Sequence, residues 1–187
     1  MGWMTFSSRR QRRVIGACVV GAAVALSLAF SGAAAVAAPP SCGSSGLDVW
    51  LNTDGNGAAG TIFYQLEFTN ISGHTCTITG YPGVSAVNLA GHELGSAARR
   101  NPTQNAHTVT LASESPTNMA GGTASVTLGI VEAGNFSPSA CHEVIAAGLR
   151  VYAPGQPASQ VVHLPFGACS RTGPVFLNVE AAQKSDA

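Results

Sequence analysis

The 187-residue sequence contains few of the side chains that nucleic-acid-binding proteins and many enzymes use. Charged residues make up 10% of the chain, and Lys184 is its only lysine, so lysine-assisted catalysis has no participant. After residue 37, only Arg99 and Arg100 are adjacent basic residues. This charge distribution argues against binding of nucleic acid or of an anionic membrane surface.

Motifs of catalysis and metal binding are also missing. The sequence has no Gly-x-Ser-x-Gly, Ser-x-x-Lys, Cys-x-x-Cys or His-x-x-x-His. The dipeptides His92-Glu93 and His142-Glu143 lack the second histidine of a metalloprotease helix. Met119 is the only methionine beyond the N-terminal segment, which leaves copper without a set of soft ligands. We therefore expect no catalytic residue, no cofactor and no metal site.

The N-terminal segment has the pattern of an export signal. Four arginines between Arg9 and Arg13 precede an apolar run over residues 14–30, and Ala35-Val36-Ala37 fits a signal-peptidase site. The run is short for a membrane anchor and is diluted by alanine and glycine. We expect residues 1–37 to be cleaved, which leaves 150 residues with five positive and nine negative charges, a net of −4.

Cysteine usage agrees with export to an oxidising compartment. Cys18 is removed with the signal, and Cys42, Cys76, Cys141 and Cys169 remain, an even number. Four cysteines allow three pairings, of which we favour Cys42–Cys76 and Cys141–Cys169, because each would join neighbouring segments. Each bridge would close a loop of about 30 residues and contribute about 3–4 kcal/mol in the chain-entropy model.

Hydrophobic residues recur with period two rather than 3.6, which indicates β-strands. The clearest runs are Leu47 to Leu51, Ile62 to Phe68 and Ala124 to Ile130. Asn70 to Gly73 should form the turn after the second run. Val144 to Ala147 is the only segment that we expect to form a helical turn.

These runs predict an all-β protein of about eight or nine short strands, an antiparallel immunoglobulin-like β-sandwich stabilised by two disulfides. A closed barrel is the alternative. We expect a single domain over residues 38–180 and a disordered tail over residues 181–187.

Two aromatic side chains are candidates for a binding face. Trp50 falls on the polar side of its predicted strand, and Phe63 falls on the polar side of the next. If these strands pair, the two side chains could form an exposed apolar patch, and such patches often mark binding surfaces. The alternative is that a second layer or a loop covers them.

Three motifs resemble a known family. They are Leu66 to Asn70, Thr75 to Thr77 and Gly80 to Val84, and together they resemble the secreted actinobacterial proteins grouped as domain of unknown function 4232. The resemblance implies a domain over about residues 42–179. The loop at residues 112–121 is longer than the corresponding loop expected for the family. It also implies an exported or lipid-anchored envelope protein of mycobacteria or their relatives. The family has no assigned activity, so no catalytic residue is transferred.

The sequence as a whole predicts an exported, non-catalytic protein that binds a partner or has a structural role in the cell envelope or medium. The partner would be an unidentified protein or envelope component, and no membrane span would remain after signal cleavage. The alternatives are a small secreted hydrolase and a metal-handling envelope protein.

Overall fold

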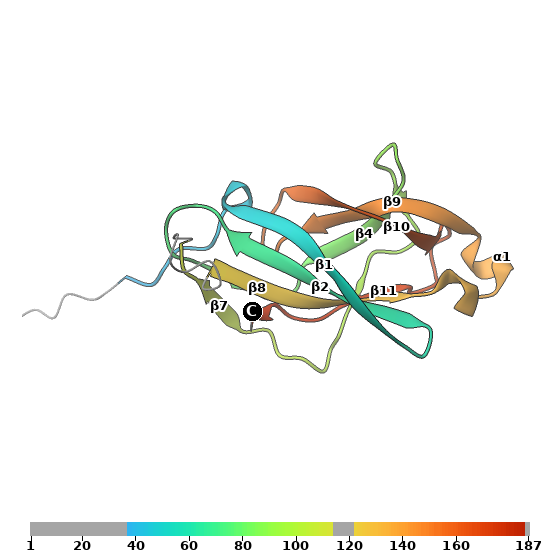
Figure 1. Ribbon diagram of the computed structural model, residues 1–187, viewed down its shortest axis with the longest axis horizontal. Coiled ribbons are helices and arrows are strands. Elements are labelled where there is room, and N and C mark those ends of the chain that lie inside the picture. The colour runs from blue at the N-terminus through green and yellow to red at the C-terminus, as the bar shows by residue number, and fades with distance from the viewer. Residues whose placement is uncertain (1–36, 114–121, 186–187) are drawn as a thin grey trace, which may run out of the picture. The chain divides into compact units, whose positions relative to one another are not determined.

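The computed structural model describes residues 37–113 and 122–185 (Figure 1). The predicted signal peptide, except for Ala37, therefore lies outside the described residues, as do residues 114–121 of the long loop that follows Leu111. Within the described ranges, no helix has the length and apolar character needed to span a membrane.

The larger sheet is built around β2 (Thr61–Asn70) and β8 (Thr123–Val131), which pair antiparallel along their whole lengths. β1 (Leu47–Ala58) pairs with the free edge of β2. The other edge of β8 pairs with β11 (Leu177–Val179) and with β12 (Gln183–Lys184), and β6 (Arg99–Arg100) runs parallel to β11. In Figure 1, β1, β2 and β8 lie side by side.

The second sheet has the order β10-β9-β4-β5 and is antiparallel throughout. Its strands are β10 (Ser159–Cys169), β9 (Glu143–Tyr152), β4 (Gly83–Val87) and β5 (Glu93–Leu94). A separate antiparallel pair joins β3 (Cys76–Thr79) to β7 (Thr108–Leu111). The short helices are η1 (Ser44–Gly46), η3 (Ala133–Asn135) and α1 (Pro138–Cys141).

Both sheets contribute to one hydrophobic core. Leu66 and Phe68 of β2 are fully buried, as are Leu128 of β8 and Leu149 of β9. Complete burial of such a side chain contributes roughly 1.5–3 kcal/mol before the entropy of ordering it is subtracted. The predicted all-β antiparallel architecture is confirmed, with eight of the twelve strands in the described residues at least four residues long.

Two disulfides cross-link this framework with the pairing that the sequence favoured. Cys42 joins Cys76 across 34 residues, and Cys141 joins Cys169 across 28. Their Cα atoms lie 4.9 and 4.5 Å apart, within the range that a disulfide spans. All four residues are buried, so the bridges are part of the core.

The turn after β2 forms as expected and is organised by Asn70. This residue is fully buried, and its Nδ2 donates to the carbonyl oxygens of His74, Leu111 and Ala112 at 2.8–3.2 Å. Its Oδ1 accepts hydrogen bonds from the backbone N–H and the hydroxyl of Ser72. One side chain therefore connects the end of β2 to the end of β7.

The expected helical turn at Val144–Ala147 is wrong, because these residues lie in β9, where β-branched Val144 and Ile145 pair with β10. The helical turn lies just before, in α1. Pro138 occupies its first position, where a missing N–H removes no helix hydrogen bond, and His142 ends it at φ 49°.

The expected disorder of the tail is also wrong for residues 181–185. Ala181 and Ala182 are buried, and β12 pairs with β8. The backbone N–H of Ala182 donates to Gly80, and that of Ala181 donates to the side chain of Gln104. Two small apolar residues thus reach the core after the last predicted strand. Residues 186–187 lie outside the described part of the chain.

Candidate functional site

The candidate site lies on the outer face of the larger sheet, the side turned away from the core. Leu66 and Phe68 point into the core, so Gln65 and Glu67 point outward from the same strand. Residues directly opposite one another in antiparallel strands share a face. The register places Trp50 of β1 beside Glu67, and Glu67 beside Ser125 of β8.

Glu67 is buried although it belongs to the outer face. Only 6% of its surface is exposed, and its Oε2 atom is buried without a hydrogen-bond partner, the only such side-chain atom in the described residues. Burial raises the pKa of this carboxyl above its ordinary value. An unsatisfied buried polar atom costs about 1–3 kcal/mol, so its retention needs an explanation.

A hollow of about 350 Å³ opens beside this carboxyl. Its floor is formed by Gln65 and Glu67 of β2 together with Ser125 and Thr127 of β8. The C-terminal segment, residues 180–185, forms the wall and includes Gln183, Lys184 and Ser185. The segment that the sequence predicts to be a disordered tail therefore contributes to the lining of the hollow.

Trp50 is not among the residues that line the hollow, but it lies opposite Glu67, and 43% of its surface is exposed. Its Nε1 donates to the Thr69 hydroxyl oxygen at 3.0 Å, and that oxygen lies 3.1 Å from the hydroxyl of Thr123. These contacts hold the indole on the outer face and satisfy its only polar atom. The exposed part of the ring is therefore apolar.

Phe63 also lies on the outer face, but it does not form one patch with Trp50. Trp50 is opposite Glu67, whereas Phe63 is opposite Asn56, beyond an irregularity in the pairing of β1 with β2. Four residues along β2 separate the two positions by roughly 13 Å. Phe63 is half-buried, and its ring lies over Gly129 of β8.

A second hollow, of about 280 Å³, includes Phe63 in its lining together with Arg99 and Arg100. A wider one, of about 470 Å³, lies along β7 and is lined mainly by threonines and His107. Neither contains a buried polar atom without a partner. The hollow beside Glu67 is therefore the strongest candidate.

The histidines lie apart from this hollow. In the described residues, no three His, Cys, Asp or Glu side chains come close enough together to hold a metal ion. Among the histidines that the structure describes, His142 is the one whose ring is within hydrogen-bond distance of a serine hydroxyl, with Nδ1 3.0 Å from that of Ser170. That hydroxyl donates to the carbonyl oxygen of His142 at 2.7 Å, so its single proton is not directed at the imidazole.

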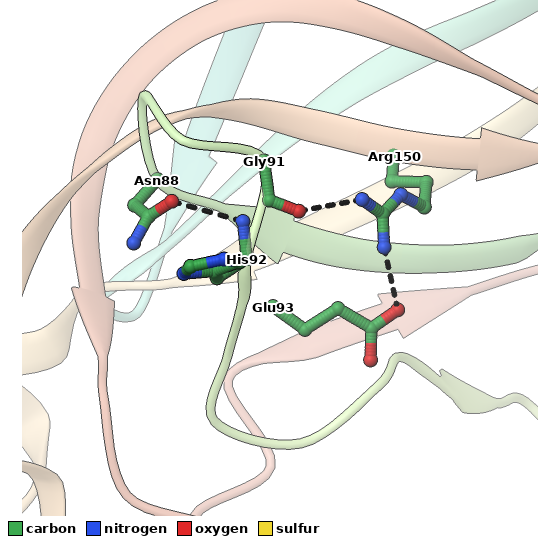
Figure 2. Close-up of polar contacts among 5 residues, drawn as sticks. All are labelled: Asn88, Gly91, His92, Glu93 and Arg150. Carbon is green, nitrogen blue, oxygen red and sulfur yellow. Dashed lines mark hydrogen bonds and ion pairs between the residues drawn. The ribbon is translucent and has the colours of Figure 1, made fainter.

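The first His-Glu dipeptide has a structural role in the loop between β4 and β5. Figure 2 shows Arg150 of β9 donating to the Gly91 carbonyl oxygen and pairing with Glu93, whose Oε1 lies 3.3 Å from Nη1. Asn88 Oδ1 accepts from the backbone N–H of His92 at 2.9 Å. The Arg150–Glu93 pair is the only ion pair in the described part of the chain.

Comparison with known proteins identifies the family. The family model named domain of unknown function (DUF4232) matches residues 42–183, about three quarters of the chain. The chain belongs to the DUF4232 family. The matched region includes both disulfides and most of the hollow beside Glu67. No curated protein and no solved structure matches the chain, so the DUF4232 assignment carries no activity with it.

Sequence reasoning placed Trp50 correctly on the outer face but missed Glu67. The alternation in β2 puts Glu67 on the same side as Gln65 and Phe63, which suggests a solvated carboxylate. Its neighbours across the sheet are Trp50 of β1 and Ser125 of β8, and the C-terminal segment lines the hollow beside it. One sequence signal could have found Glu67. Pairing the two predicted strands outward from the turn between them places this carboxylate on the same face of the sheet as Trp50.

Proposed function

We propose that this DUF4232 protein is an exported, non-catalytic binding module that recognises its partner through the outer face of the larger sheet. The observation that carries the proposal is the buried, unpartnered Oε2 of Glu67 beside the exposed Trp50. A ligand that displaces the groups covering this oxygen and donates a hydrogen bond to it would relieve the cost of the unsatisfied atom. An unpaired buried carboxyl oxygen lowers the stability of the fold, so its presence is better explained by a role in ligand binding.

Export is supported by two independent features. The first 37 residues have the charge and hydropathy pattern of a cleaved signal. The remaining four cysteines all form disulfides, which persist in oxidising compartments and are rare in the cytosol. The cell envelope and the surrounding medium are thus the proposed locations.

The test is binding of purified residues 38–187, tagged at the N-terminus, to the envelope fraction of the producing cell. We expect wild-type protein to sediment with the envelope and Trp50→Ala to lose most of that binding. The matched control is Leu89→Ala, because Leu89 is 98% exposed in the loop between β4 and β5. Equal binding by wild type and Trp50→Ala would disprove the proposed face.

A hydrolase is the second candidate, and the contact between His142 and Ser170 is the observation behind it. The binding module is favoured because the Ser170 proton is directed to a carbonyl oxygen rather than to the imidazole. A general base must accept the proton of its nucleophile. Labelling of Ser170 by a fluorophosphonate probe would overturn the non-catalytic proposal, whereas an unlabelled protein would support it.

A further inference from the structure

We infer that the outer face around Glu67 binds a neutral oligosaccharide, with a hydroxyl of one sugar ring in the hollow donating to Glu67 and an adjoining ring packed on the indole of Trp50. This inference rests on the proposed function, because it takes the outer face as the binding site and names the class of ligand. The contacts, the burial and the charge of the site each support it.

The first support is the chemistry of the lining. Gln65, Ser125, Thr127 and Gln183 present amides and hydroxyls, groups that both donate and accept hydrogen bonds. A sugar hydroxyl has the same dual capacity. An extended apolar ligand would leave these groups without hydrogen-bond partners, which would lower its affinity. The lining therefore selects a ligand rich in hydroxyl groups.

The second support is Glu67, whose Oε2 is buried and lacks a donor. A hydroxyl group that reaches this carboxyl would supply the missing hydrogen bond, and hydrogen bonds to charged groups are about twice as strong as neutral ones. Burial also favours the protonated carboxyl, which can donate to a hydroxyl oxygen. A hydroxyl satisfies either protonation state, and neither an ammonium group nor a carboxylate does so.

The third support is the orientation of Trp50. Its Nε1 is already bonded to Thr69, so the exposed part of the ring offers apolar surface only. The C–H face of a pyranose is apolar, and its hydroxyls project around the ring edge. An aromatic side chain that is half-exposed beside polar groups matches this amphipathic shape.

Charge and size agree with a neutral ligand of one or two sugar rings. Glu67 and Glu180 line the hollow with Lys184 as its only cationic side chain, so a strongly anionic ligand is disfavoured. Lys184 in the wall likewise opposes a cationic ligand. The volume of about 350 Å³ is near the lower end of the range for small-molecule sites.

The experiment uses residues 38–187 and the hexaoses of cellulose, starch, xylan and mannan as probes. Trp50 is the only tryptophan after residue 37, so its fluorescence reports directly on the site. We expect a saturable fluorescence change with at least one hexaose. Calorimetry should then show that Trp50→Ala and Glu67→Ala bind that hexaose at least about tenfold more weakly, as loss of one strong contact predicts.

Two variants control for folding and location. Glu67→Gln keeps the size of the side chain, so it tests the carboxyl if Glu67→Ala does not fold, and we expect weaker binding than in wild type. Leu89→Ala should bind like wild type. Circular dichroism melting curves should confirm that every variant used is folded.

The failure of this inference can be distinguished from failure of the proposed function. If no hexaose binds at millimolar concentration while Trp50→Ala still abolishes envelope binding, the oligosaccharide is wrong and the binding face stands. If Trp50→Ala leaves envelope binding unchanged, both are wrong. Saturable binding of tetramethylammonium or acetate at Trp50, without any hexaose, would also overturn the inference.

Discussion

Trp50 of β1 and Glu67 of β2 lie directly opposite one another on the outer face of the larger sheet, and their exposures are reversed from what their polarities suggest. The indole is 43% exposed, whereas the carboxyl residue is 6% exposed. The usual arrangement buries the aromatic ring and solvates the acid. This inversion distinguishes the outer face from an ordinary solvent-exposed sheet surface.

Glu67 should make stability depend on pH. Burial raises its pKa above the ordinary value, so between the two values the folded protein binds more protons than the unfolded chain. The free energy of unfolding therefore falls as the pH rises through this window. The Glu67→Gln variant has no carboxyl that can titrate at this position, so it does not lose stability in this pH window. We expect the variant to gain stability relative to wild type between pH 3 and pH 7, by on the order of 1 kcal/mol.

Urea denaturation at both pH values measures this difference. Glu143→Gln is the control, because Glu143 is exposed and the substitution removes the same carboxyl group at the surface. If the Glu67→Gln curve runs parallel to wild type across the range, the carboxyl is solvated in solution and the buried arrangement is wrong.

Asn70→Asp should be strongly destabilising. Aspartate keeps the acceptor for Ser72 but removes the donor to three carbonyl oxygens and brings a carboxyl against them. We expect the free energy of unfolding to fall by about 3 kcal/mol, as for loss of buried hydrogen bonds with a charge introduced. Chemical denaturation at pH 7 measures the change.

Asn88→Asp is the matched control for Asn70. The Asn88 side chain acts through Oδ1, which accepts from the backbone N–H groups of Ala90 and His92, and aspartate retains that acceptor. We expect a change within about 0.5 kcal/mol. Similar losses at both positions would mean that the three carbonyl contacts of Asn70 contribute little.

The disulfides should be complete and stabilising. Titration of denatured, unreduced residues 38–187 should detect no free thiol, because all four cysteines are paired. Replacing either pair by alanine should lower the free energy of unfolding by about 3–4 kcal/mol, since the closed loops are similar in length. Four reactive thiols in the wild-type protein would refute the disulfide framework.

Ala182→Glu should be far more damaging than Gln183→Glu. Ala182 is fully buried and Gln183 is exposed, although the two are adjacent near the C-terminus. We expect the first substitution to cost at least about 3 kcal/mol, because it buries an unpaired charge. The second should stay within about 0.5 kcal/mol. Comparable urea midpoints for the two variants would show that the C-terminal segment is not packed as described.

The strands were predictable because the alternation of apolar and polar residues along a strand indicates which of its side chains are buried. Ile62 to Phe68 shows a clean period of two, and the structure forms β2 there. Val144 to Ala147 lacks alternation, since small alanines follow two β-branched residues, and pairing with β10 decides its conformation. Ala181 and Ala182 likewise carry no periodic signal, and their burial comes from contacts with Gly80 and Gln104.

The candidate site was only half predictable. Trp50 could be assigned to the outer face from its own strand, because an aromatic residue among polar neighbours stands out. The surroundings of Glu67 come from three segments that are far apart in sequence, β1, β8 and the C-terminal segment. Nothing in the alternation within β2 reports on these neighbours.

The position of the C-terminal segment has a practical consequence for handling the protein. Gln183, Lys184 and Ser185 follow one another along the chain and all three line the hollow. Chain that continues from residue 185, whether native sequence or a fused tag, is therefore joined directly to a segment that lines the hollow. Attachment at residue 38 adds nothing to this segment, so if the proposed site is right, an N-terminal fusion should detect ligands that a C-terminal fusion misses.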